Sequence, residues 1–253
     1  MTAQGEAGAA FAALEASWPP AETFRRGPWR LRRGDGGGKR VSAATAEAPV
    51  RAEDVALAEA AMRDMGQTPL FMLREDEEGL DAKLAERGYR LVDPTAIHVG
   101  AIADLAATPV PPMRCFPHWP PLAIVAQLWA DADIGPQRRA VMARVQGPKA
   151  ALLGRDRDRA AGAAFVACQG SWAVLHALQV VPAHRRTGLG RDLVRAAAIW
   201  AAGAGAVRLA VAVTQDNVAA TALYAALGMR PLARYHYRQA TQETADDRPA
   251  HRP

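Results

Sequence analysis

The feature that most constrains the fold is the order of hydrophobic patterns in the second half of the chain. Strand-like runs at 150–154, 160–167 and 172–181 precede a helix at 188–202, a strand at 207–213, a helix at 217–227 and a strand at 231–237. Strands that come first and then alternate with helices are typical of a mixed sheet with helices on its faces. The second half therefore predicts an α/β fold.

The first half predicts a smaller α/β unit. We expect strands at 29–33 and 39–44, joined by the sequence GDGGG (34–38) as a hairpin tip, then helices at 53–65 and 80–87 with strands at 69–73 and 89–99. A proline-rich stretch, 108–121, breaks regular structure and marks a boundary. We therefore expect two domains, 1–107 and 108–240, and a flexible tail at 241–253, which has almost no apolar side chain.

Composition excludes several classes of protein. Of 253 residues, 50% are hydrophobic and 23% are charged, the balance of a soluble globular protein. No run approaches the roughly 20 apolar residues that a membrane-spanning helix needs, and the first ten residues do not resemble a signal peptide. Two cysteines, Cys115 and Cys168, are too few for a disulfide framework and lack zinc-site spacing. We expect a cytoplasmic protein without a metal and without a membrane partner.

Positive charge is concentrated in one segment. The formal net charge is +5, and the segment between Gly170 and Ala240 alone holds eight arginines against two aspartates. Such a field indicates an anionic ligand, either a nucleic acid or a phosphorylated small molecule. Charge alone leaves both open, but the segment has no recognition helix or aromatic array for nucleic acid, so we expect no nucleic-acid partner.

The segment from Leu175 to Trp200 predicts an anion site built from main chain. A β-rich run ends at Pro182, a basic pair follows, and Gly188 and Gly190 stand where a helix begins. Glycines let the backbone approach a ligand closely, and a helix start presents unpaired N–H groups with partial positive charge. A Walker loop is excluded because none of the three lysines lies here, and a dinucleotide fingerprint would need a third glycine.

The pattern Val180-x-Pro182-x-x-Arg185-Arg186-x-Gly188-x-Gly190 resembles the acyl-CoA pyrophosphate loop of the GNAT superfamily of N-acetyltransferases. A second element, with Asn217, Ala220, Leu223, Tyr224 and Gly228 in register, is similar to the family's Asn-x-x-Ala-x-x-Leu-Tyr-x-x-x-Gly segment. Helical spacing places an amide and a phenol on one stripe of that helix. The resemblance covers about 121–237.

The resemblance implies the GNAT acyl-CoA N-acyltransferase fold, with acetyl-CoA as cosubstrate and direct attack by a primary amine in a ternary complex. It implies that main chain near Val180 pairs with the pantetheine arm and polarises the thioester, and that Tyr224 protonates the departing thiolate. The implied coenzyme-binding residues are Leu178, Gln179, Val180, Arg185, Arg186, Thr187, Gly188, Leu189, Gly190, Arg191 and Asn217.

The general base is open. Positions where several family members carry a glutamate match Val174 and Ala212, which cannot take a proton. His176 lies on the same side as Val180 by strand alternation, so it is either the base or a hydrogen-bonded structural histidine. His184, beside the loop, is a phosphate-side or surface residue.

The acceptor is expected to be a small-molecule or peptide amine, and the protein a monomer or homodimer. The loops at 119–145 and the final strand are expected to build the acceptor pocket, with Tyr235, His236 and Tyr237 either lining it or packing. A non-catalytic acyl-CoA-binding module is the alternative function.

The first half also resembles the family faintly, over 69–92. Its equivalent loop, 46–54, has no glycine, so a pyrophosphate could not approach the backbone closely. We therefore expect a degenerate, non-catalytic copy at the N-terminus.

Overall fold

The computed structural model describes residues 2–240, so the predicted tail at 241–253 lies outside the described residues. Its strands are β1 (Glu22–Arg26), β2 (Trp29–Arg33), β3 (Thr45–Ala46), β4 (Leu70–Arg74), β5 (Arg90–Ala101), β6 (Cys115–His118), β7 (Lys149–Asp156), β8 (Arg159–Gln169), β9 (Trp172–Val180), β10 (Arg208–Thr214) and β11 (Arg230–Gln239). Its α-helices are α1 (Ala3–Ala16), α2 (Ala52–Asp64), α3 (Glu78–Glu86), α4 (Ile102–Ala106), α5 (Ala123–Ala130), α6 (Pro136–Arg144), α7 (Leu189–Gly203) and α8 (Val218–Ala226). Two short 3₁₀ helices, η1 (Lys39–Val41) and η2 (Pro182–His184), complete the described elements.

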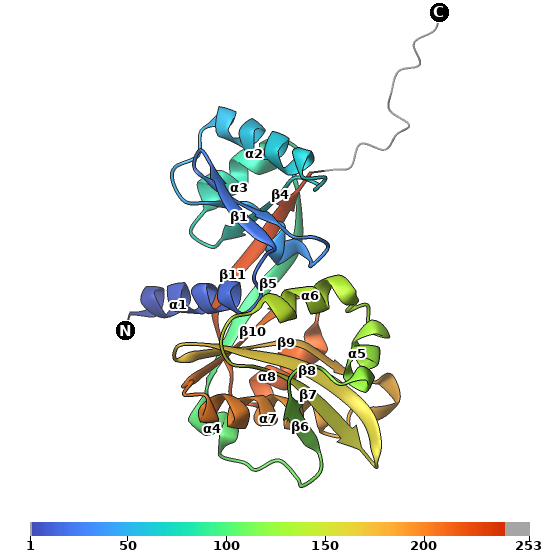
Figure 1. Ribbon diagram of the computed structural model, residues 1–253. Coiled ribbons are helices and arrows are strands. Elements are labelled where there is room, and N and C mark those ends of the chain that lie inside the picture. The colour runs from blue at the N-terminus through green and yellow to red at the C-terminus, as the bar shows by residue number, and fades with distance from the viewer. Residues whose placement is uncertain (1, 241–253) are drawn as a thin grey trace, which may run out of the picture.

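An eight-stranded mixed sheet organises the molecule, in the order β4-β11-β5-β10-β9-β8-β7-β6 (Figure 1). β6, β7, β8 and β9 pair antiparallel, β9 pairs parallel with β10, and the remaining pairs are antiparallel. The predicted α/β class, a mixed sheet flanked by helices, is confirmed.

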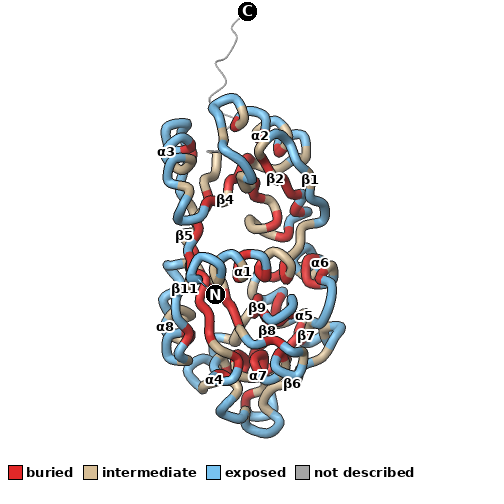
Figure 2. Tube along the Cα trace, turned by 90° about the vertical axis from the view of Figure 1, so that its left-hand side faces the viewer, coloured by how far each residue is buried: buried red, intermediate tan, exposed pale blue. Residues whose placement is uncertain are grey.

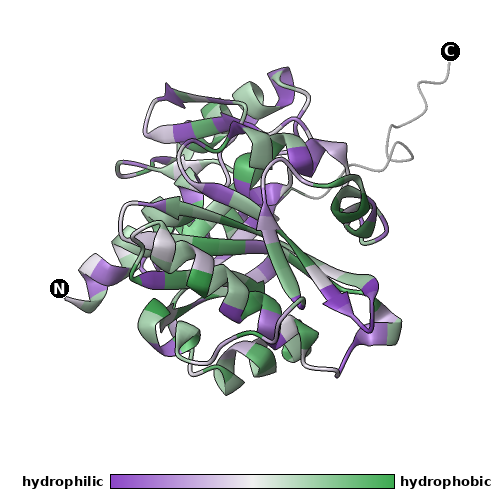
Figure 3. Ribbon diagram, turned by 60° about the horizontal axis from the view of Figure 1, so that its bottom comes forward, coloured by the Kyte–Doolittle hydropathy of each residue, from purple (hydrophilic) through white to green (hydrophobic). Residues whose placement is uncertain are grey.

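Helices cover both faces of this sheet. On one face, α4 and α7 pack over the strands through a core that includes Leu189, Leu193 and Ala197. On the other face lie α1 and the α5–α6 pair, with Trp129 and Met142 fully buried between helices and strands. Figure 3 shows hydrophobic residues running along the strands between these two layers. Removal of these apolar side chains from water is the main force that holds the layers together.

A smaller lobe is formed by the three-stranded sheet β1-β2-β3 together with α2, α3 and the outer part of β4 (Figure 1). Its core contains Trp29, Phe71 and Leu84. The long strands β5 and β11 join this lobe to the rest of the molecule. β5 is buried from Thr95 to Gly100, where it lies between β10 and β11 (Figure 2).

β5 precedes the predicted boundary at 107/108 and nevertheless lies inside the sheet that residues after 108 build. It pairs with β10 over Thr95–Ala101 and with β11 over Arg90–Val99. Sheet hydrogen bonds therefore cross the boundary, and the division into domains 1–107 and 108–240 stays a prediction.

The glycine-rich hairpin predicted at 34–38 is wrong. The hairpin is formed instead by β1 and β2 around Gly27, and GDGGG leads into η1. A Cβ on Gly34 would lie 2.0 Å from Ser42 Oγ, and one on Gly37 would lie 2.4 Å from Val141 Cγ2 of α6. These glycines are needed for close packing of a loop against distant residues, which no local turn pattern reveals.

Candidate functional site

The site begins where β9 and β10 separate. The two strands pair only from Trp172/Arg208 to Leu175/Val211, while β10 continues along β5 to Thr214. At the point of separation Ala177 has a φ of +52° and the register with β8 shifts, which is a β-bulge. The Trp129 indole N–H donates to the Ala177 carbonyl over 2.9 Å and holds the bulge. The edge of β9 that faces β10 is therefore left without a partner strand.

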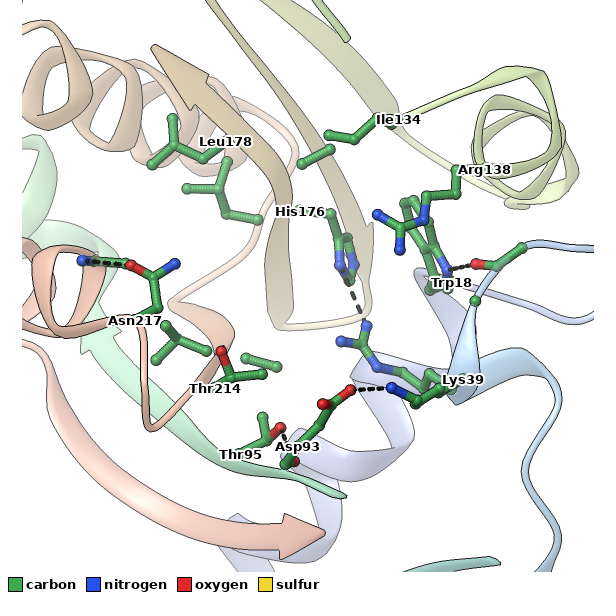
Figure 4. Close-up of a pocket in the computed structure, with 18 of the residues that line it drawn as sticks. Trp18, Lys39, Asp93, Thr95, Ile134, Arg138, His176, Leu178, Thr214 and Asn217 are labelled. Carbon is green, nitrogen blue, oxygen red and sulfur yellow. Dashed lines mark hydrogen bonds and ion pairs between the residues drawn. The ribbon is translucent and has the colours of Figure 1, made fainter. Parts of the chain in front are cut away.

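The bulge interrupts the side-chain alternation assumed from the sequence. His176, Leu178 and Gln179 all line a pocket of about 490 Å³ at the separation, whereas Val180 and Arg185 line a second hollow of about 280 Å³. The first pocket, which we call the splay pocket, is drawn in Figure 4. Its other walls come from Trp18, Gly37, Gly38, Lys39, Arg40, Asp93, Thr95, Ile134, Arg138, Leu175, Ala177, Ala212, Val213, Thr214, Asn217, Ala220, Tyr224, Tyr235 and Tyr237.

The loop before α7 presents a run of main-chain donors. Among residues 2–240, no acceptor pairs with the amide N–H groups from Arg186 to Arg191; the next amide, that of Asp192, donates to the Gly188 carbonyl over 3.0 Å. Gly188 has a φ of +86° and begins the helix, and a Cβ on Gly190 would meet nothing closer than 3.4 Å. Consecutive free amides at the start of a long helix fit a diphosphate, so the residues present are compatible with acyl-CoA.

Side chains in this loop have mixed roles. Leu189 is buried in the core, so only its main chain can meet a ligand. Thr187 Oγ1 donates to the His184 carbonyl over 2.9 Å, and Arg185 Nε donates to the Val180 carbonyl over 3.2 Å. These bonds fix the course of the loop, and coenzyme contacts of Arg185 and Thr187 stay a prediction.

A network of charged side chains holds the loop before α7 in place. Arg114 forms ion pairs with Asp156 (2.7 Å) and Asp192 (3.0 Å), and its third nitrogen donates to the Thr187 carbonyl over 3.0 Å. His184 Nδ1 lies 2.8 Å from Asp156. The hydrogen bond from His184, together with that from Arg114, lowers the pKa of Asp156. His184 therefore anchors the loop, a role that its position beside the basic pair did not indicate.

The helix α8 contributes a phenol and an amide. Tyr224 is buried, lines the splay pocket, and has no hydrogen-bond partner among the described residues. Burial raises its pKa to about 12, so the hydroxyl keeps its proton at neutral pH. Asn217 Oδ1 accepts from the Ala220 amide over 3.1 Å and caps α8, which leaves its amide nitrogen toward the pocket. The sequence motif thus brings both side chains to one wall.

His176 is buried at the edge of the splay pocket, and its ring is held by several neighbours. Its ring packs against Trp18 and Phe165, its Nε2 lies 2.8 Å from Ser17 Oγ, and its Nδ1 lies 3.4 Å from Arg40 (Figure 4). Because an arginine only donates, Nδ1 accepts and Nε2 carries the proton. Burial, with the charge of Arg40, holds the pKa of His176 well below its ordinary value. Both ring nitrogens are engaged in this arrangement.

Sequence reasoning missed the wall that the N-terminal half supplies. Lys39 and Arg40 enter from η1, and Asp93 enters from β5 and pairs with Lys39 over 2.7 Å. The only sequence signal was a basic pair directly after a glycine run, which was interpreted as a strand. On β11, Tyr235 and Tyr237 line the pocket, whereas His236 turns away and contacts Asp81 at 2.7 Å.

Within residues 2–240, no group of three His, Cys, Asp or Glu side chains is placed to hold a metal ion. This finding does not test the prediction that the protein uses no metal. Nor is any helix of this part long and apolar enough to cross a membrane.

Comparison with known proteins agrees with the geometry. Residues 114–229 match the model of the acetyltransferase (GNAT) family. The uncharacterized N-acetyltransferase YobR of Bacillus subtilis (strain 168) is 26% identical over 234 residues, which is 88% of this chain and 94% of that protein. Among solved structures, a GCN5-related N-acetyltransferase from Kribbella flavida superposes with a TM-score of 0.69 at 22% identity, covering 95% of this chain and 97% of the other.

A tandem GNAT protein from the clavulanic acid biosynthesis pathway shares the fold as well, with a TM-score of 0.61 at 19% identity over 92% of this chain and 88% of that one. Residues 114–229 therefore resemble the GNAT family in sequence, and the chain shares the fold of solved GNAT N-acetyltransferases. The family uses acetyl-CoA as cosubstrate, as the sequence resemblance implied.

Proposed function

We propose that this protein transfers an acetyl group from acetyl-CoA to a primary amine by direct attack in a ternary complex. The observation that carries the proposal is the combination of free amides from Arg186 to Arg191 with a splay pocket that contains the buried phenol of Tyr224. The free amides suit the phosphate end of a thioester coenzyme, and the open edge of β9 with the phenol beside it suits the acyl end. Both ends of the coenzyme could therefore be held at once.

The chain's own residues divide the work of binding. The amides of the 186–191 loop would hold the diphosphate, and the arginines there would add charge-assisted hydrogen bonds. Main chain of Leu178, Gln179 and Val180 would pair with the pantetheine arm, because β10 no longer occupies that edge of β9. An N–H near Val180 would polarise the acyl carbonyl. When bound, acetyl-CoA supplies an activated acyl group at this point.

Tyr224 would act as the acid. As the amine nitrogen bonds to the acyl carbon and the C–S bond breaks, the phenol gives its proton to the sulfur, and one amine proton leaves to water, which returns a proton to the phenol. A phenol with its pKa raised to about 12 is fully protonated at the start of that step. Proton transfers of this kind contribute roughly 10² to 10⁴ in rate.

His176 as general base stays a prediction. Its hydrogen bonds to Ser17 and Arg40 count against it, because no ring lone pair is free in the tautomer that they require. We propose instead that the fraction of the amine that is already uncharged in solution binds and reacts. His176 would then position Ser17 and Arg40 rather than take a proton.

The N-terminal copy is proposed to bind no coenzyme. In the loop that corresponds to 186–191, the Arg51 amide is already taken by Asp54 Oδ2 over 2.8 Å, and Glu53 and Asp54 place negative charge in the first turn of α2. A carboxylate stands where a phosphate would have to bind, so the site repels anions.

Thiol release from acetyl-CoA with a panel of primary amines tests the function, with product mass as confirmation. We expect release that depends on the amine and falls sharply in Tyr224→Phe. If the parent binds CoA tightly but turns over no amine of the panel, the alternative function, a non-catalytic acyl-CoA-binding module, is favoured instead.

A further inference from the structure

The splay pocket carries an excess of positive charge on the side opposite α8. Three cations line it, Lys39 and Arg40 from η1 and Arg138 from α6, and the one carboxylate among the lining residues, Asp93, is already paired with Lys39 at 2.7 Å. Neither arginine forms an ion pair with any carboxylate of residues 2–240. Two guanidinium groups therefore face this pocket without a counter-ion from the described part of the chain.

Arg40 is the more informative of the two, because it is held in place by uncharged groups. Its terminal nitrogens lie 3.4 Å from His176 Nδ1 and 3.5 Å from Tyr235 Oη, and its Nε is buried without any partner. Arg40 as a whole is partly buried, and a charge that has lost part of its water without gaining an opposite charge is costly. An anionic ligand in the splay pocket would supply the missing opposite charge.

The residues behind Arg40 orient its guanidinium without neutralising it. His176 accepts from Arg40 through Nδ1 and donates through Nε2 to Ser17 Oγ, which in turn donates to the Leu14 carbonyl over 3.2 Å. Burial and the nearby Arg40 keep the ring uncharged by lowering the pKa of His176. Burial likewise raises the pKa of Tyr237 well above its ordinary value, so this phenol supplies no anion either. The full charge of Arg40 stays available to the pocket.

The anion that Arg40 would meet is not the coenzyme diphosphate. No residue of the 186–191 loop lines the splay pocket, whereas Tyr224 and Leu178, at the proposed reacting end, do. In Figure 4, Leu178 and Asn217 lie on one side of the cavity, while Lys39 and Arg138 lie on the other, next to His176. The second substrate would enter the space between these sides.

We propose that the acceptor is an amine that also carries an oxyanion group, a carboxylate or a phosphonate-like group, which Arg40 binds and Arg138 helps to attract. This inference rests on the proposed function and specifies its substrate class. The guanidinium takes the oxyanion in a two-pronged hydrogen bond, which fixes the distance from the anion to the amine and directs the nitrogen to the acyl carbon. Amino acids are the simplest compounds of this class.

Matched acceptors test the proposal. Free amino acids, their C-terminal amides, the corresponding decarboxylated amines and aminoalkylphosphonates are compared by thiol release at saturating acetyl-CoA. We expect kcat/KM for the anionic acceptors to exceed that for the uncharged ones by at least about 30-fold, the loss expected when one partner of a buried charge pair is missing. The carboxylate and phosphonate arms tell which oxyanion is preferred. Equal turnover of amides and free acids would overturn the inference and leave the proposed function standing.

Variants assign the effect to the residue. Arg40→Gln is expected to abolish the preference for anionic acceptors through KM, and Arg40→Lys to restore part of it. Arg138→Gln should lower kcat/KM for anionic acceptors by a smaller factor, whereas Arg139→Gln, on the same helix but outside the pocket, serves as the matched control and should change nothing. An anion preference that persists in folded Arg40→Gln contradicts the proposal, and if that variant does not fold, Arg138→Gln and Arg40→Lys still decide.

Binding without turnover separates the two proposals. Propionate, methylphosphonate and propionamide are titrated into CoA-loaded protein by calorimetry, with Trp18 in the pocket wall as a fluorescence probe. Saturable binding of the two anions, weakened in Arg138→Gln, supports the anion site even if no amine is acetylated and the proposed function fails. Equal binding of propionamide, or no binding of either anion, refutes the site.

Discussion

Replacing Tyr224 with phenylalanine should separate catalysis from stability. The hydroxyl has no hydrogen-bond partner among the described residues and the ring is buried, so the change removes no hydrogen bond and keeps the ring. We expect the free energy of unfolding to change by no more than about 1 kcal/mol, because no hydrogen bond is lost. The rate of acetyl transfer should fall by roughly 10² to 10⁴, which corresponds to about 3 to 5 kcal/mol of activation free energy.

The assay is thiol release at saturating acetyl-CoA with the best amine of the panel, beside thermal unfolding and CoA binding. Tyr89→Phe is the control: its hydroxyl donates to Glu59 over 2.8 Å, far from the pocket, so it should lose about 1 kcal/mol of stability and keep full activity. Since the pKa of Tyr224 is about 12, the parent should show no loss of kcat from phenol ionisation below about pH 11. A Tyr224→Phe variant that stays within a few-fold of the parent rate would remove the phenol from the mechanism.

Three further results are expected. Gly190→Ala should keep or slightly raise the free energy of unfolding, since a Cβ there meets nothing closer than 3.4 Å. It should weaken CoA binding about tenfold or more, because the methyl group covers the free amides. Gly203→Ala, at the other end of α7, is the control and should leave CoA affinity unchanged in the same titration. His176→Gln should reduce the fall in urea midpoint between pH 7 and pH 5. The pKa of His176 is lowered in the folded state, so its contribution to stability is present above the ordinary value of 6.5 and is lost as the pH falls. A variant with the same pH dependence as the parent would show that the ring is not buried and neutral. Asp81→Asn should reduce the loss of stability between pH 4 and pH 2. The hydrogen bond from Arg238 lowers the pKa of Asp81 to about 2, so its contribution to stability is present above 3.8 and disappears as the pH falls toward 2. Equal urea midpoints for the parent and the variant over this range would contradict it.

The parts of the site that are local in sequence could be predicted. Gly188 and Gly190 stand at a strand-to-helix turn, and Asn217 and Tyr224 fall on one helical stripe, so short-range spacing alone brings them to a common ligand. The mixed sheet followed from the order of hydrophobic runs for the same reason.

The rest depends on contacts that no local pattern encodes. Arg40 and Trp18 reach the pocket because Trp18 and Val41, the neighbour of Arg40 on η1, pack in one core cluster with α5, α6, β7 and β8, and no local pattern marks such distant partners. The bulge at Ala177 has no glycine or asparagine to announce its positive φ, so alternation along β9 was assumed to continue to Val180. The helix α1 is built mostly of small residues without a strong apolar stripe, which hid it from periodicity.

The interleaving of β5 between β10 and β11 has a consequence for how this gene product can be divided. A polypeptide that started at 108 would lack β5, so β10 and β11 would each have an edge without a hydrogen-bonded neighbour. Exposed strand edges of this kind pair with other chains and favour aggregation. Production of the two pieces side by side should instead allow them to recombine, much as split reporters do. A piece taken from a relative would have to present the same register, since β5 pairs with β10 on one side and β11 on the other.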